Sequence, residues 1–252
     1  MSTLRALFWY GWLPVTLIFV WQAISQTGWI PAFLLPAPTT VLHTAWSLLS
    51  SGALVHHAWV SSLRVLGGFW VSASLAIGLA FLFHRFRWLS RSSFVLVEAL
   101  RLIPPLSLVP LLILWMGIDE APKIAIVVLA TFFPVYLSVS HALENAEQKW
   151  DELSAMLTLT RAQHYRHILW PATLPALSTG LQIGFGYAWR ALVSAELLAA
   201  ASGLGYLIED AATLMHTDVV LVGVLTIALL GMLSEALFKR FLTRLIGRKE
   251  GK

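Results

Sequence analysis

The segment DELSAMLTLTRAQHYRHILWPATLP, Asp151 to Pro175, is the longest polar-rich stretch in a strongly apolar chain, and apolar sequence flanks it on both sides. The 252 residues are 58% hydrophobic and 12% charged, with a mean hydropathy of +0.76. Soluble domains carry about 25% charged residues, so this chain has too few charges to cover the surface of a globule. The composition therefore predicts an integral membrane protein, with this segment as a polar loop.

Six apolar runs approach the roughly 20 residues that a spanning helix needs. We expect an all-α membrane protein of about six transmembrane helices, or five if the short fourth run does not span. A cleaved signal peptide is the alternative for the first run, but its Trp and Tyr residues are typical of interfacial anchors and no clean cleavage site follows. The runs are Phe8–Ile24, Val65–Phe83, Phe94–Ile118, Ile124–Ser140, Ala172–Ala200 and Val219–Phe238.

The basic residues predict the orientation of these runs. With both termini in the cytoplasm, Lys123 alone lies outside, and Arg64, Arg101 and Arg190 lie within or at the ends of helices. Such an imbalance follows the positive-inside rule, so the net charge of +4 is a topology signal and not a nucleic-acid footprint. Thirteen basic residues are then cytoplasmic: Arg5, Arg85, Arg87, Arg91, Lys149, Arg161, Arg166, Lys239, Arg240, Arg244, Arg248, Lys249 and Lys252.

Two segments, Ser25–Val60 and Ala201–Asp218, are then external. In the first, Thr39 or Thr40 is expected to cap a short amphipathic helix that lies at the outer interface. The apolar face of that helix comprises Val41, Leu42, Ala45, Trp46 and Leu49.

The first half of the loop segment carries Leu153, Met156 and Leu157 at positions i, i+3 and i+4, which predicts a short helix with one apolar face. A turn is expected at Thr158 to Thr160, with Thr160 as a possible cap for the next helix. The uncovered apolar face would suit a groove in another protein. The alternative is a helix that rests on the bilayer surface.

A second helix is predicted from about Arg161 to Leu169, with Arg161 and Arg166 exposed and the apolar side chains turned inward. Pro171 is expected to end it, because proline lacks the N–H group that an ongoing helix needs. Pro175 then marks the entry into the fifth span.

The loop resembles the cytoplasmic signature of the inner-membrane permease subunits of bacterial binding-protein-dependent ABC importers. In that signature an E-A-A motif is followed by Gly six residues after the Glu and by an I-x-x-P ending. Glu152, Leu153 and Ser154 stand at the E-A-A positions, and Ile168 and Pro171 stand at the ending. Thr158 replaces the usual Gly, so the turn must adopt an ordinary conformation or carry strain, since a β-branched residue resists positive φ.

The resemblance extends over about residues 35 to 240 and favours the nitrate, sulfonate and taurine branch. It implies the type I importer permease fold and a small sulfonate, taurine or nitrate-like anion as substrate, with a pyrimidine vitamin precursor as the alternative. The stretches that carry it are LPAPTTVL (35–42), SSLRVLGGF (61–69), PPLSLVPLLILWMGI (104–118), FFPVYLS (132–138), WRALVSAEL (189–197) and GLGYLI (203–208).

The resemblance also implies the partners. The chain contains no G-x-x-x-x-G-K-[ST] motif, so ATP and Mg²⁺ are expected on separate ATP-binding subunits, and no cofactor is expected here. The other implied partners are an extracytoplasmic substrate-binding protein, a second permease copy and membrane lipid.

We expect an N-terminal span and external segment (1–60), a permease domain (61–240) with its coupling segment at 144–171, and a basic cytoplasmic tail (241–252).

Charged residues within spans are costly unless they face protein or water. Glu98 and Arg101 are three residues apart and could pair on one helix face. Arg190 and Glu196 lie about 120° apart round a helix, so each needs a partner elsewhere. Arg101, Arg190 and Glu196 are candidate substrate-pathway residues, and structural ion pairs between helices are the alternative.

The remaining candidate residues point to helix packing and not to metal binding or catalysis. Gly180, Gly184 and Gly186 permit close helix approach, either within the subunit or at a dimer seam. The pairs His56–His57 and His164/His167 lack the further ligands of a metal site. A membrane enzyme would need a motif such as G-x-S-x-G or H-E-x-x-H, and neither occurs. A stand-alone channel or secondary transporter is the other rival.

Overall fold

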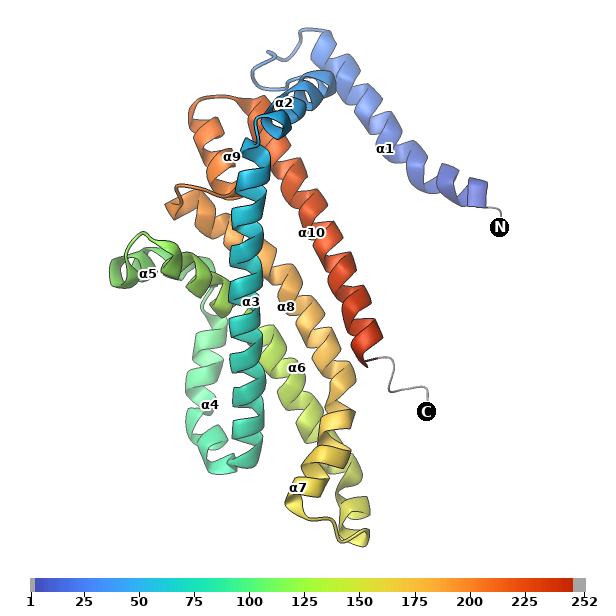
Figure 1. Cartoon of the computed structure of the whole chain (residues 1–252), viewed down its shortest axis with the longest axis vertical. Coiled ribbons are helices and arrows are strands. Elements are labelled where there is room, and N and C mark those ends of the chain that lie inside the picture. The colour runs from blue at the N-terminus through green and yellow to red at the C-terminus, as the bar shows by residue number, and fades with distance from the viewer. Residues whose placement is uncertain (1–2, 247–252) are drawn as a thin grey trace. The chain divides into compact units, whose positions relative to one another are not determined.

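A computed structural model describes the backbone of residues 3–246, and the side chains of residues 12–150, 156–160, 162–198 and 200–245. Over this range the elements are helical, with no strand, which confirms the all-α membrane fold (Figure 1). The helices are α1 (Thr3–Gln26), α2 (Pro38–Ser50), α3 (Ala53–Arg85), α4 (Arg87–Leu102), the 3₁₀ helix η1 (Pro105–Leu108), α5 (Val109–Met116), α6 (Glu120–Met156), α7 (Arg161–His164), the π-helix η2 (Tyr165–Leu169), α8 (Trp170–Ala199), α9 (Leu204–Thr213) and α10 (Thr217–Ile246).

Among the described residues, three helices are long and apolar enough to cross a membrane, or four if the bent pair of α4 with η1 and α5 counts as one span. The three are α3, α6 and α10, which contain the expected second, fourth and sixth spans. The short fourth run gains its length from flanking residues, because α6 is 37 residues long. For the runs in α1 and α8, spanning stays a prediction.

The expected third span is not one straight helix. The chain bends by 91° between α4 and the pair η1 and α5, so this region is a broken span or a re-entrant loop. Ile103 has φ −78° and ψ 119°, the extended conformation that the residue before a proline prefers, and Pro104 follows it. The cluster of prolines thus ends α4.

The chain divides into two compact units. One unit contains residues 1–60 and 201–228, which include both segments predicted to be external. There the Thr44 hydroxyl donates to Asp218 over 2.6 Å, and Thr217 donates to the carbonyl of Phe33 over 2.5 Å. Side-chain hydrogen bonds thus join two segments that are far apart in the sequence.

The amphipathic helix of this unit starts two or three residues earlier than expected. Ala37 is the N-cap of α2 and Pro38 begins it, so the prediction of Thr39 or Thr40 as the cap was wrong. Proline suits the first turn of a helix because its fixed φ is helical and the N–H it lacks would have no intrahelical partner there. Leu42, Trp46 and Leu49 are exposed along one face, whereas Val41 is buried.

The second unit contains residues 61–200 and 229–252. Within it α6 and α8 pack along each other (Figure 1). A Cβ atom on Gly180 would lie 2.6 Å from the Ser138 Cβ, and one on Gly184 would lie 3.0 Å from the Val135 Cγ2, so both glycines allow this close packing. A Cβ on Gly186 would meet no atom within 4 Å. The two glycines therefore serve packing within the subunit.

Candidate functional site: the coupling segment and the charged side chains

The first part of the coupling segment is the end of a long helix. We predicted a separate short helix here, and this was wrong, because α6 continues from its span to Met156 without a break. Residues 141–150, HALENAEQKW, contain neither Gly nor Pro to stop it. Met156 is 83% exposed and Leu157 is 56% exposed. The side chains of the predicted motif residues Glu152, Leu153 and Ser154 lie outside the described residues.

The turn after α6 takes the strained alternative. Thr158 has φ +48°, in the left-handed region that glycine adopts freely. For a residue with a Cβ atom this conformation costs about 1–2 kcal/mol. The turn therefore has a backbone conformation that glycine would adopt freely, although a β-branched residue stands there.

The helix after the turn begins as predicted. Thr160 and Gln163 form a capping box, in which the Gln163 amide oxygen accepts from the Thr160 N–H over 2.9 Å and the Gln163 N–H donates to the Thr160 hydroxyl over 3.4 Å. This confirms Thr160 as the cap. The sequence signal for the reciprocal bond was the T-x-x-Q spacing.

The end of that helix differs from the prediction. Pro171 does not terminate it, because the chain passes from the π-helix η2 directly into α8. The Trp170 N–H donates to the carbonyl of Tyr165, five residues back, and this wider register accommodates a residue without an N–H group. Leu169 is buried, Ile168 is half-buried, and the Tyr165 ring lies 5.7 Å from that of His84. The segment is thus packed on its inner side.

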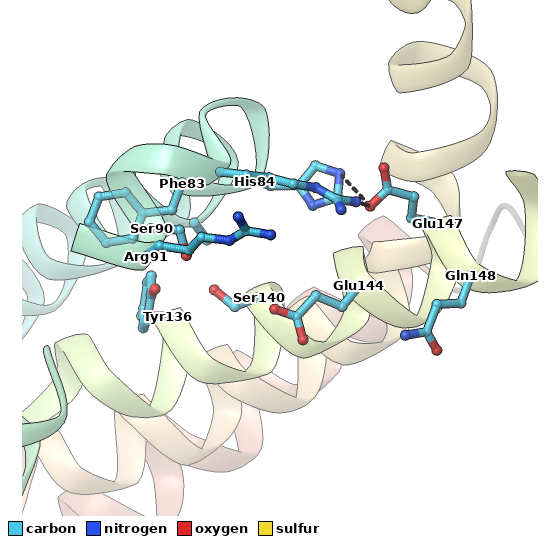
Figure 2. A pocket seen from close by; sticks show the side chains of 11 residues that line it. Phe83, His84, Ser90, Arg91, Tyr136, Ser140, Glu144, Glu147 and Gln148 are labelled. Carbon is cyan, nitrogen blue, oxygen red and sulfur yellow. Dashed lines mark hydrogen bonds and ion pairs between the residues drawn. The ribbon is translucent and has the colours of Figure 1, made fainter. Parts of the chain in front are cut away.

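A polar cavity of about 470 Å³ lies next to this segment. Figure 2 shows Arg91 of α4 extending into it, opposite Tyr136, Ser140 and Glu144 of α6. Arg87 donates to Glu147 over 2.6 Å, which ties the start of α4 to the part of α6 that leads to Met156. An ion pair thus connects the bent pair to the helix that ends in the coupling turn.

A buried charge network lies elsewhere in the same unit. Arg64 of α3 donates through Nη1 to Glu196 of α8 over 2.7 Å, and through Nε and Nη2 to Glu120 of α6 over 2.5 and 2.6 Å. Ser61 donates to the Glu196 carboxylate, and Lys123 donates to Glu120 over 3.1 Å. Arg64 is 5% exposed and Glu196 is 0% exposed. Three helices therefore meet at two cations and two carboxylates whose charges cancel.

This network shows which residue pairs with Glu196. The sequence required a partner on another helix, and Arg64 is that partner, so Glu196 forms an interhelical ion pair. The sequence predicts that Arg64 lies within or at the end of a helix, but it does not identify a partner for this side chain. The available signal was that Arg64 is the sole Lys or Arg between Arg5 and Arg85.

The other two pathway candidates have different surroundings. Arg101 donates to Glu98 over 2.5 Å, which confirms the pair predicted from the three-residue spacing, and this pair is partly exposed. The Arg190 guanidinium lies 5.7 Å from the Tyr187 ring centroid, and in the described part of the chain no carboxylate forms an ion pair with it. Arg190 and Glu196 do not meet, as expected.

The histidines form no metal-ligand set within the described ranges, where no group of three His, Cys, Asp or Glu residues could hold an ion. His57 instead accepts the Gly203 N–H at Nδ1 over 3.1 Å, and its ring lies 5.9 Å from that of Tyr206. His164 contacts Tyr165 edge-on.

Comparison with known proteins identifies the class. SsuC of Escherichia coli, a permease protein named for aliphatic sulfonates transport, is 38% identical over 232 residues, which cover 92% of this chain and 88% of the relative. TauC of the same organism, a taurine transport system permease protein, is 31% identical over 87% of this chain and 82% of its own length. RibX of Chloroflexus aurantiacus, a riboflavin transport system permease protein, is 32% identical over 92% and 89%.

Residues 72–247 match the family described as the binding-protein-dependent transport system inner membrane component. That match includes the end of α6, the coupling turn, the whole of α8 and Glu196. The relatives are permease components of transport systems, which argues against both a membrane enzyme and a stand-alone carrier. The chain belongs to this family and is a multi-pass inner-membrane permease of the ABC importer class.

Proposed function

We propose that this permease imports an organic sulfonate and that a separate subunit binds and hydrolyses the ATP. The substrate class is supported by the relatives named for aliphatic sulfonates and taurine. The separate ATPase is supported by the lack of a phosphate-binding P-loop motif in the sequence. A vitamin-type substrate is the second candidate, favoured by the similarity to a riboflavin permease.

The observation that carries the coupling proposal is the exposed apolar end of α6. Met156 is the last residue of a helix that also forms a candidate span, and Leu157 follows it directly, so a force applied at this end reaches the membrane domain directly. Covering both side chains would remove on the order of 200 Å² of apolar surface from water, or about 5 kcal/mol before ordering costs. A groove in the ATPase subunit is the proposed occupant, and the motif residues Glu152 to Thr158, with Ile168 and Pro171, form the docking element.

The proposed topology places both termini and the coupling segment 144–171 in the cytoplasm. The positive-inside distribution supports it. Residues 1–60 supply a span and part of the external unit, residues 61–240 form the permease domain, and residues 241–252 form the basic tail. The external unit would receive the substrate-binding protein, and two permease copies in the lipid bilayer would complete the pathway.

Of the three pathway candidates, Arg190 is the one we assign to the substrate. Arg101 and Glu196 are each neutralised by an opposite charge, whereas Arg190 stacks near an aromatic ring and keeps its donors available. An unneutralised cation within a span suits an anionic solute.

The coupling proposal is tested by Met156→Glu in a permease co-expressed with its ATP-binding subunit. A charge at this position would be desolvated in an apolar groove, so co-purification of the ATPase should fall at least tenfold. The matched control is Met215→Glu, a methionine in the proposed external unit that is 73% exposed, and this change should leave co-purification unchanged. Full ATPase recovery with Met156→Glu, or equal loss with both variants, would refute docking at this turn.

A further inference from the structure

A second cavity is lined by none of the residues of the coupling segment or of the charge network. It measures about 300 Å³, and its walls come from η1, α6 and α8. Ile126 forms part of its floor and belongs to a buried apolar cluster with Val109, Leu112 and Ala195. The lining residues are Pro105, Leu106, Ile126, Ala130, Tyr187, Arg190, Ala191 and Ser194.

Arg190 is the sole charged residue in this lining. It lies nine residues before the end of α8, or about 14 Å along the helix axis, which is inside the hydrocarbon layer if that end is at the interface. Arg190 is exposed on the subunit. Because a charged side chain at this depth normally faces water or protein, the cavity side of α8 does not face lipid.

The cavity has few polar groups, and they differ in the hydrogen-bond donors that they can offer to a ligand. The Ser194 hydroxyl donates to the Arg190 carbonyl over 2.9 Å, so its proton is already used. The Arg190 guanidinium offers several N–H groups in a planar fork, which matches the oxygen atoms of a sulfonate or carboxylate. The lining contains no acidic side chain that could pair with a ligand cation.

We propose, on the basis of the function proposed above, that this cavity binds an organic anion with a short apolar tail. The anionic head contacts Arg190, and the tail lies against Pro105, Ile126 and Ala130. A zwitterion such as taurine is disfavoured because its ammonium group would lose water and find no carboxylate in the lining to pair with. An inorganic ion such as sulfate leaves the apolar wall uncovered. The permease itself therefore selects an aliphatic anion over both.

The test uses the absence of cysteine from the chain. Ser194→Cys introduces a single thiol into the cavity of the assembled transporter in lipid nanodiscs, where a water-soluble thiol reagent can reach it. Saturating pentane-1-sulfonate should slow the labelling at least tenfold, whereas taurine and sulfate at the same concentration should not. Ser50→Cys, an exposed position in α2 outside the proposed ATPase contact, is the control, and its labelling should not respond to any of the three.

Two variants separate the head from the tail. Adding Arg190→Met should abolish protection, and Arg190→Lys should retain part of it because the charge remains. Ala130→Leu should narrow the cavity, so that methanesulfonate still protects and pentane-1-sulfonate does not. If Arg190 had only a structural role, no sulfonate would bind in this cavity, and Ala130→Leu would not produce this dependence on chain length.

The inference is overturned if taurine or sulfate protects as well as pentane-1-sulfonate, or if Arg190→Met keeps full protection. It is also overturned if Ser194→Cys stays unlabelled while Ser50→Cys reacts, since lipid or a second copy would then fill the cavity. ATP-dependent uptake of pentane-1-sulfonate is measured in parallel. Uptake without protection refutes this site alone, whereas no uptake of any sulfonate refutes the proposed substrate.

Discussion

Replacing Arg64 by methionine should be far more damaging than the same replacement of Arg101. Both arginines pair with a glutamate, but Arg64 and Glu196 are 5% and 0% exposed, whereas the Arg101 side chain is 40% exposed. Arg64→Met leaves the Glu196 carboxylate buried with the Ser61 hydroxyl and without its cation. Leaving one partner of a buried pair uncompensated costs about 3–5 kcal/mol, whereas breaking an exposed pair costs about 0–1 kcal/mol.

The second step of this prediction is a double-mutant cycle. Adding Glu196→Gln to Arg64→Met removes the buried charge and keeps an amide that can bond to Ser61, so most of the lost stability should return. The assay is thermal unfolding of the purified transporter in detergent. By the size scaling of about 2–4 °C per kcal/mol, Arg64→Met should lower Tm by roughly 10 °C and Arg101→Met by less than about 4 °C.

The reasoning fails if the two single variants shift Tm equally. It also fails if the double variant is no more stable than Arg64→Met, because the penalty would then come from lost packing and not from an unpaired charge. Uptake measured on folded Arg64→Met/Glu196→Gln protein shows whether the network has a further role in transport.

Three further predictions concern backbone strain, helix packing and coupling. Thr158→Gly should raise Tm, because glycine avoids the cost of φ +48°, a gain of about 1 kcal/mol. Part of that gain is lost because glycine also increases the conformational entropy of the unfolded chain. An unchanged or lower Tm would argue against a left-handed turn. Gly180→Ala should destabilise by about 1–3 kcal/mol through overlap with α6, whereas Gly186→Ala should be neutral, and equal Tm values would contradict the packing. If the Arg87–Glu147 ion pair transmits motion from α6 to α4, Arg87→Glu should reduce uptake while ATP hydrolysis persists. Adding Glu147→Arg should then restore uptake, because the pair is re-formed with its charges exchanged, and no rescue would refute that role.

The sequence predicted features that depend on near neighbours along the chain. The spacing of Glu98 and Arg101 predicted their ion pair, and Thr160 was identified as a cap because the turn lay directly before a helix-forming run. The substitution of Thr158 for glycine limited the turn to two conformations, and the structure shows the strained one. These features involve residues within one or two helical turns of each other.

Features that depend on packing between helices were not predictable in the same way. Arg64 is 132 residues from Glu196, and their contact requires that α3 and α8 meet at that height and orientation. The unbroken length of α6 and the π-helix before Pro171 depend on which hydrogen-bond partners the backbone N–H and carbonyl groups find where one helix passes into the next segment. The cavity beside Arg190 needs three elements, including η1 beyond the 91° bend.

The central claim is that this permease moves solute only when an ATPase subunit acts on it through the coupling turn. The most direct measurement is accumulation of pentane-1-sulfonate in proteoliposomes that contain the permease, with the substrate-binding protein added outside and ATP enclosed, in the presence and absence of an ATP-binding subunit on the luminal side. The account predicts accumulation against a gradient only when the ATP-binding subunit and ATP are present, and its loss with Met156→Glu. Accumulation by the permease without that subunit, or undiminished ATP-driven uptake by Met156→Glu, would contradict it.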